Sequence, residues 1–149
     1  MSEEVFGSIE GKEGLEAFDD IFGVIQARPG SYSPLVLAYI GDAIYELMIR
    51  SYMVKQGNKP VNKLHKMTKD YVKASAQKDL YFRIKDMLTE EEISIFKRGR
   101  NAKSATKAKN ATVSDYKTAT GLEALFGYLY LKGDVSRIMR LIVGGIKDE

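Results

Sequence analysis

Residues 35–46 read LVLAYIGDAIYE, and this stretch decides the fold because its apolar residues surround a single acid at helical spacing. At about 100° per residue, one face of the predicted helix carries Ile40, Ala43, Ile44 and Leu47. The opposite face carries Asp42 together with Leu35, Ala38, Tyr45 and Ile49. A helix that is apolar nearly all round is normally buried, and a buried carboxylate needs a partner charge, hydrogen bonds or a metal. We therefore expect Asp42 to be buried and to take part in the chemistry of a functional site. The plainer alternative is a structural aspartate whose oxygens are hydrogen-bonded in the core or at a subunit interface.

A second acid lies inside another apolar stretch, residues 120–131, which read TGLEALFGYLYL. Thr120, Glu123 and Gly127 fall on one helical side, and Gly127 leaves room for another backbone or a ligand to approach the carboxylate. The alternative makes Gly127 a simple helix-packing contact. Two acids on two apolar helices, with almost no basic residue to neutralise them, predict a hard-cation site built from oxygen ligands.

The steps Gly41-Asp42-Ala43 and Glu123-Ala124-Leu125 resemble those of the ribonuclease III endonuclease domain. The closer resemblance is to Mini-ribonuclease III, the short bacterial branch without a double-stranded-RNA-binding domain, and it is carried by residues 37–46 (LAYIGDAIYE) and 98–104 (RGRNAKS). It runs from about Ser33 to the C-terminus. Full-length ribonuclease III has two further acids, four positions before the Asp and three before the Glu, where this chain has Ala38 and Thr120. This departure leaves the number of metal ions open.

The resemblance implies an all-α, ribonuclease III-like fold that forms a homodimer. It also implies a Mg²⁺-dependent endoribonuclease of double-stranded RNA that leaves 5′-phosphate and 3′-hydroxyl ends, with each of the two sites cutting one strand. Asp42 and Glu123 would hold Mg²⁺ directly or through its waters, so that the ion activates the nucleophile and stabilises charge on the phosphate. The implied role is maturation of the large-subunit ribosomal RNA precursor, with the need for a ribosomal protein on that RNA left open. Independently, the apolar second face of the Asp42 helix favours a homodimer.

The net charge of +3 is unevenly distributed, because residues 93–114 contain six Lys or Arg and no acid. These cations are Lys97, Arg98, Arg100, Lys103, Lys107 and Lys109. The Gly, Asn, Ser and Thr between them predict a loop, and flexible cations with short polar neighbours suit a phosphate backbone. A solvated surface loop is the commoner meaning of such a run. Its position between the two carboxylate helices, and its match to the family's loop, favour RNA contact.

The rest of the chain shows helical spacing and clear stop signals, without strand alternation. The expected helices cover 34–57, 61–88, 89–99, 115–131 and 135–146, with a break in the second near Lys78-Asp79. Ser33-Pro34 is expected to cap the first, and residues 89–92 (TEEE) form a capping-box pattern. His65 and Glu46 are not assigned to the site, because one histidine forms no familiar catalytic pair and Glu46 is more simply a surface acid.

Residues 1–30 form a separate acidic segment, with seven acids and two bases. Their apolar residues Leu15, Phe18, Ile21, Phe22 and Ile25 predict one amphipathic helix on the surface of a catalytic domain at 31–149. The absence of cysteine excludes disulfides and thiolate chemistry. Without an apolar run of membrane-spanning length or a signal-peptide pattern, we expect a cytoplasmic protein that does not contact a membrane.

Two other functions remain open from the sequence. A non-catalytic member of the same fold could bind structured RNA during ribosome assembly, which the missing acids at Ala38 and Thr120 favour. An all-helical protein-interaction module would make Asp42 and Glu123 plain buried polar contacts. Loss of cleavage with retained RNA binding in Asp42→Asn would separate the enzyme from both.

Overall fold

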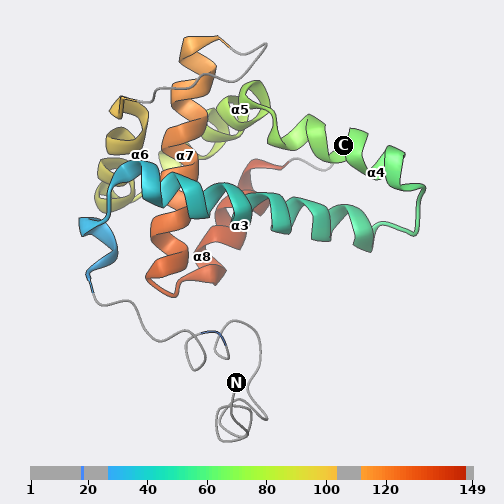
Figure 1. The fold of residues 1–149 in the computed structure, drawn as a ribbon, viewed down its shortest axis with the longest axis horizontal. Coiled ribbons are helices and arrows are strands. Elements are labelled where there is room, and N and C mark those ends of the chain that lie inside the picture. Colours follow the sequence, from blue (N-terminus) through green and yellow to red (C-terminus); the bar gives the residue numbers. More distant parts are fainter. Residues whose placement is uncertain (1–17, 19–26, 104–111, 147–149) are drawn as a thin grey trace, which may run out of the picture.

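The computed structural model describes Phe18 and residues 27–103 and 112–146 (Figure 1). In order, its elements are η1 (Pro29–Ser31), α3 (Pro34–Lys55), α4 (Val61–Val72), α5 (Ala74–Ile84), η2 (Lys85–Met87), α6 (Glu90–Asn101), α7 (Val113–Leu131) and α8 (Val135–Gly145). The described ranges contain helices and no strand, which confirms the all-α prediction. None of these helices is both long and apolar enough to cross a bilayer. The amphipathic helix expected within residues 1–30 lies outside the described residues, apart from Phe18 and 27–30.

Helix α7 is the centre of the domain, because it packs against α3, α5, α6 and α8 (Figure 1). It is buried on almost every side, and its core side chains include Leu122, Leu125 and Phe126, all fully buried. A helix that is apolar all round is stable in water only when neighbours cover it completely, and these four helices do so. Glu123 is the one acid in this covered stretch.

Helices α3 and α7 cross with their backbones in contact, at Gly41 on α3 and Gly127 on α7. A Cβ added to Gly41 would overlap the carbonyl oxygen of Glu123, and one added to Gly127 would overlap the carbonyl oxygen of Leu37. No other residue type fits at either position without moving the helices apart. Gly127 is therefore a contact between packed helices, as the alternative interpretation held, and the backbone that it admits belongs to α3.

The division of α3 into faces differs from the sequence prediction. The buried face carries Leu37, Ala38, Gly41, Ile44, Tyr45, Ile49 and Met53. Ala43 and Leu47 are exposed, although they were expected to share a face with buried Ile44, and the side chain of Asp42 is exposed as well. The expected burial of Asp42 is therefore wrong for the single chain. The sequence of an almost uniformly apolar helix does not indicate which of its faces is buried. In α3 the close crossing at Gly41 determines the buried face.

The predicted break near Lys78-Asp79 is wrong, because the break lies at Lys73, whose φ of −62° and ψ of 153° are extended. No Gly or Pro marks this position. Two orphaned carbonyls at the end of α4 are instead satisfied by side chains from other helices. The hydroxyl of Tyr45 donates to the carbonyl of Tyr71 at 2.9 Å, and Nε2 of Gln77 donates to the carbonyl of Val72 at 2.8 Å. In Figure 1 the second half of α3 and all of α4 extend together away from α6 and α7.

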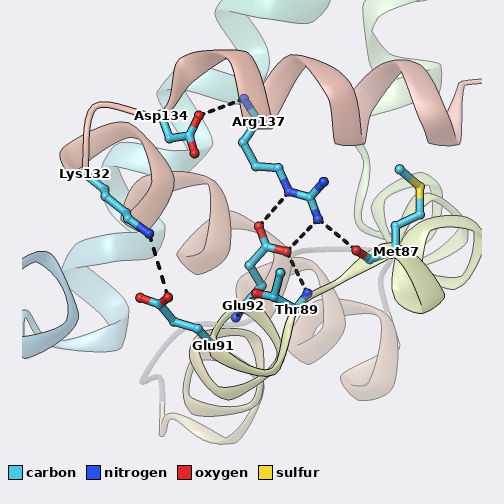
Figure 2. Close-up of polar contacts among 7 residues, drawn as sticks. All are labelled: Met87, Thr89, Glu91, Glu92, Lys132, Asp134 and Arg137. Carbon is cyan, nitrogen blue, oxygen red and sulfur yellow. Dashed lines mark hydrogen bonds and ion pairs between the residues drawn. The ribbon is translucent and has the colours of Figure 1, made fainter.

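The capping box at the start of α6 is confirmed, and it also anchors α8 (Figure 2). The backbone N–H of Thr89 donates to Oε1 of Glu92 at 2.9 Å, and that of Glu92 donates to Oγ1 of Thr89 at 3.2 Å. Arg137 of α8 donates from Nε and Nη2 to the two oxygens of Glu92, both at 2.8 Å, and from Nη2 to the carbonyl of Met87 at 2.8 Å. Burial raises the pKa of Glu92, but the hydrogen bonds from Arg137 and Thr89 outweigh it and the pKa is lowered.

Candidate active site

Asp42 and Glu123 lie next to each other at the crossing of α3 and α7, as the hard-cation hypothesis requires. Asp42 follows Gly41 directly, and the carbonyl of Glu123 touches Gly41, so the backbone contact sets the approach of the two carboxylates. Glu123 is partly buried, whereas Asp42 faces solvent. The pair therefore has one protected and one accessible carboxylate.

The pKa of Glu123 is raised to about 8. Burial is the largest cause, followed by the charge of Asp42 and a hydrogen bond with it, while a hydrogen bond from Gln77 acts in the opposite direction. Two adjacent carboxylates cannot both ionise easily, so Glu123 keeps its proton near neutral pH. A divalent cation can replace that proton, because it neutralises both charges at once.

The residues present fit a divalent cation held by few protein ligands. Within the described ranges, no group of three or more His, Cys, Asp or Glu side chains gathers to hold an ion. Ala38 is buried and offers no ligand, and the hydroxyl of Thr120 donates to the carbonyl of Tyr116 in its own helix at 2.9 Å. Mg²⁺ suits such a site, since it usually keeps several waters and binds proteins through one or two carboxylates.

Gln77 of α5 is a residue of this site that the sequence analysis missed. It is 3% exposed, and its Nε2 lies 3.4 Å from Oε2 of Glu123 while also donating to the carbonyl of Val72. Its Oε1 is buried and has no hydrogen-bond partner among the described residues. The sequence signal that could have identified Gln77 is its helical spacing, which places this polar side chain one turn before Leu80 on the buried face of the helix.

Tyr45 is buried near Glu123 and serves the core. Its ring stacks on that of Phe126, with centroids 5.5 Å apart, and its hydroxyl donates a hydrogen bond to the carbonyl of Tyr71. Burial, followed by the nearby Tyr71 and Glu123, raises the pKa of Tyr45. Tyr45 therefore stays neutral and serves packing rather than proton transfer.

The predicted RNA-binding cations have different surroundings. Lys97 and Lys103 are exposed, while Lys107 and Lys109 lie outside the described residues. Arg98 donates to the carbonyls of Gly30 at 2.6 Å and Tyr32 at 3.1 Å, so it joins α6 to the segment before α3. Arg100 lies over the ring of Phe96, with 5.8 Å from Cζ to the centroid, and donates to Oδ1 of Asn101 at 3.2 Å. Arg98 therefore has a structural use as well.

A second basic surface lies on α4, and none of its lysines was among the predicted RNA-binding cations. Residues 55–73 contain six lysines and a single acid, Asp70. Lys63, Lys66 and Lys69 are exposed on α4 itself. Counting charge in this window would have found the surface, but the lysines are spread among the apolar positions that define the helix.

An exposed apolar stripe runs along α3 beside Asp42. It consists of Val36, Tyr39, Ala43, Leu47 and Val54. Tyr39 is 81% exposed and Leu47 59% exposed, although both lie on the most apolar long helix of the protein. Val36, Tyr39, Ala43 and Leu47 follow one another on this face, and exposed Arg50 separates them from Val54.

A profile of the Ribonuclease III domain matches residues 35–134, which include both acids. The chain is 54% identical to a Mini-ribonuclease 3 of Clostridium tetani over 115 residues, covering 74% of this chain and 76% of that protein. It is 55% identical to a Mini-ribonuclease 3 of Thermoanaerobacter sp. over 112 residues, covering 75% and 79% of the two chains.

Among solved structures, the fold is similar to the crystal structure of protein FN1578 from Fusobacterium nucleatum. The TM-score is 0.69 at 40% sequence identity, covering 76% of this chain and 90% of that chain. The similarity therefore extends over most of the helical domain and beyond the two short motifs.

Proposed function

This chain belongs to the ribonuclease III family, in its Mini-ribonuclease 3 branch, and from that premise we propose that it cleaves double-stranded RNA with Mg²⁺ held by Asp42 and Glu123. The observation that carries the assignment of the site is the backbone contact at Gly41 and Gly127, which brings two acids distant in sequence into one interacting pair. The family membership makes the chain an endoribonuclease. The identity of the ion and of the ligands is the proposed part.

In this mechanism each acid has a distinct task. Asp42, exposed at the surface of α3, would hold the ion on the side open to the RNA, while Glu123 would hold it from the protected side. The ion, when bound, supplies charge for the developing phosphorane oxygens and lowers the pKa of water. Neither acid needs to be the base that removes the proton from the attacking water. The products are 5′-phosphate and 3′-hydroxyl ends.

The proposed substrate is a duplex in the precursor of large-subunit ribosomal RNA, and the proposed location is the cytoplasm. Exposed Lys97 and Lys103 and the lysines of α4 offer positive charge for the phosphates of an A-form helix. A ribosomal protein bound to the precursor could present that duplex. The proposed catalytic domain is residues 31–149, with 1–30 as an appended acidic segment.

A homodimer is proposed because a duplex has two strands to cut and because α3 leaves an apolar stripe exposed. Tyr39 and Leu47 would be covered by the same stripe of a second copy, in an arrangement with two-fold symmetry. Since Asp42 lies beside this stripe in α3, pairing through it would place the two sites on one assembly. Each site would then act on one strand of the duplex.

The deciding experiment incubates the purified protein with a long RNA duplex in Mg²⁺ or EDTA and maps both ends of every product. Asp42→Asn and Glu123→Gln are expected to lose cleavage by at least about 100-fold while still binding the duplex, because each removes an ion ligand without removing the basic surfaces. Glu46→Gln is the matched control. Glu46 is an acid one turn from Asp42 that pairs with Arg50 at 3.6 Å, and its loss should leave cleavage unchanged.

The same experiment addresses the two alternatives. A structured-RNA-binding scaffold would bind the duplex and leave it intact in Mg²⁺, also on a ribosomal precursor duplex. A protein-interaction module would neither bind nor cut it. Cleavage by Asp42→Asn at the rate of the unmodified protein would remove this carboxylate pair from the site.

A further inference from the structure

Gln77 is an uncharged side chain in an unusual place, because it connects a helix break to a carboxylate of the candidate site. It lies in α5, its side chain is 3% exposed, and Nε2 reaches both the carbonyl of Val72 at 2.8 Å and Oε2 of Glu123 at 3.4 Å. We propose that Gln77 is a positioning residue, which holds the Glu123 carboxylate in the orientation that receives the divalent cation. This inference rests on the proposed function of the Asp42 and Glu123 pair.

The orientation of the Gln77 amide is determined by its neighbours. Both groups near Nε2, the carbonyl of Val72 and the carboxylate of Glu123, are hydrogen-bond acceptors. Turning the amide over would place Oε1 against two oxygens and would lose both hydrogen bonds. The carbonyl of Val72 is in turn fixed by the end of α4 at Lys73. The amide therefore presents its N–H group to Glu123 from a rigid support.

A purely structural role explains this glutamine poorly. Its Oε1 is buried without a partner among the described residues, and an unsatisfied buried acceptor is destabilising. A methionine of similar size would fill the space without a polar atom left over. The carbonyl of Val72 alone does not require a side-chain amide at this position, since a water can satisfy a carbonyl at a helix end. The unpaired oxygen is the consequence of directing a neutral N–H group at Glu123.

Glu123 needs such support because no cation of the described part of the chain holds it. Among the described residues, no Lys, Arg or His forms an ion pair with Glu123. Lys78, the neighbour of Gln77, pairs with Asp115 at 3.1 Å instead. A cation at Glu123 would compete with the metal for the carboxylate, whereas a neutral N–H group orients it and leaves its charge available.

The test measures metal binding in the absence of RNA. Mn²⁺ is titrated into the purified full chain and free Mn²⁺ is followed by its electron paramagnetic resonance signal, for the unmodified protein, Gln77→Met and Gln77→Asn. We expect Kd for Mn²⁺ to rise about tenfold in Gln77→Met, as for loss of a partner that orients a metal ligand, and Gln77→Asn to show the same direction. In steady-state cleavage, the Mg²⁺ concentration for half-maximal rate should rise similarly, with KM for the duplex unchanged.

Tyr45→Phe is the matched control, because the Tyr45 hydroxyl donates its hydrogen bond to the neighbouring carbonyl of Tyr71 and not to Glu123. It should lower the melting temperature without changing Kd for Mn²⁺. An unchanged Kd in folded Gln77→Met or Gln77→Asn would overturn the inference and leave the proposed function standing. Failure of the unmodified protein to bind Mn²⁺ would instead overturn the proposed function, and this inference with it.

Discussion

At the scale of single residues, the protonation of Glu123 sets how the candidate site responds to pH. Glu123 has a pKa of about 8 because burial and Asp42 both disfavour its ionised form. Since the folded pKa lies above the unfolded value of 4.5, its contribution to stability is fully present below pH 4.5 and is lost as the pH rises through 8. A bound cation reverses this effect, because it favours the ionised pair.

The first prediction is that metal affinity depends on pH through Glu123. Below pH 8 the cation must displace a proton, so the association constant for Mn²⁺ should fall about tenfold for each pH unit and should level off above pH 8. Binding measured between about pH 6.5 and 9 checks this. An affinity that is constant over this range would mean that Glu123 is already ionised or does not bind the ion.

The second prediction concerns the ion pair of Glu92 and Arg137, shown in Figure 2. Glu92 is buried and Arg137 half-buried, so Arg137→Met leaves a buried carboxylate without its two hydrogen bonds and should lower the free energy of unfolding by about 1.5–3 kcal/mol. Glu91→Gln is the control. Glu91 and Lys132 are exposed and 3.8 Å apart, and breaking this pair should change stability by less than about 1 kcal/mol. Denaturant unfolding measures both.

The same pair gives a pH dependence of opposite sign to that of Glu123. The folded pKa of Glu92 lies below its ordinary value of 4.5, so its stabilising contribution is present above pH 4.5 and is lost as the pH falls through the folded pKa. The destabilising effect of Arg137→Met should therefore shrink on acidification. If Arg137→Met lowers the free energy of unfolding by the same amount at about pH 2.5, the loss would come from packing of the arginine stem and not from the ion pair.

At the scale of helices, the third prediction concerns the crossing of α3 and α7. In Gly127→Ala the new methyl group would overlap the backbone of α3 at Leu37, so the helices must separate, and we expect a loss of about 3 kcal/mol or more with a large loss of cleavage. Gly144→Ala on α8 is the control. Its methyl group would meet only the flexible end of Met87, at 3.0 Å, and stability should change by less than about 1 kcal/mol.

The fourth prediction compares the two basic surfaces. Replacing Lys103, Lys107 and Lys109 with alanine should weaken binding to duplex RNA and flatten its salt dependence without changing the fold. The same result is expected for Lys63, Lys66 and Lys69 of α4, since each lysine that no longer neutralises a phosphate reduces the slope of log K against log salt by about 0.7–0.9. Titrations at several salt concentrations measure the slopes. An unchanged slope would remove that surface from the RNA interface.

The helices themselves were largely predictable from the sequence. The capping box at Thr89 sets the observed start of α6, and the expected helices 115–131 and 135–146 match the observed end of α7 and start of α8. The break at Lys73 was not predictable, because it carries no Gly or Pro and its carbonyls are satisfied by distant Tyr45 and Gln77. Local sequence therefore determined where helices begin, and long-range contacts determined where one of them is interrupted.

The two acids of the candidate site could be predicted from the sequence, but the features of the site that depend on tertiary packing could not. Asp42 and Glu123 stood out because an acid in an apolar helix needs an explanation, and the structure brings both together. Gln77 did not stand out, since glutamine is common on helices and its burial depends on tertiary packing. The exposure of Asp42 could not be predicted either, because a nearly uniform helix such as α3 gives no sign of which face the rest of the protein covers.

At the scale of the whole molecule, the fifth prediction concerns self-association. If the stripe on α3 is the proposed dimer interface, Tyr39→Lys should convert a dimer into a monomer in sedimentation, because it places a charge in the centre of an apolar contact. Val143→Lys, on α8 and 66% exposed, is the control and should leave the oligomeric state unchanged. A monomer in the unmodified protein at micromolar concentration would contradict the proposed pairing.

The contact of α3 and α7 through Gly41 and Gly127 also bears on how this enzyme tolerates sequence change. Because two backbones meet there without side chains between them, the separation of the acids does not depend on the sizes of side chains elsewhere in the core. In a library that randomises apolar positions of α5, α6 and α8, specific activity per folded molecule should stay constant while expression and melting temperature vary. The chemistry would then tolerate substitution at these apolar positions, while Gly41 and Gly127 would be as intolerant as Asp42, Glu123 and Gln77.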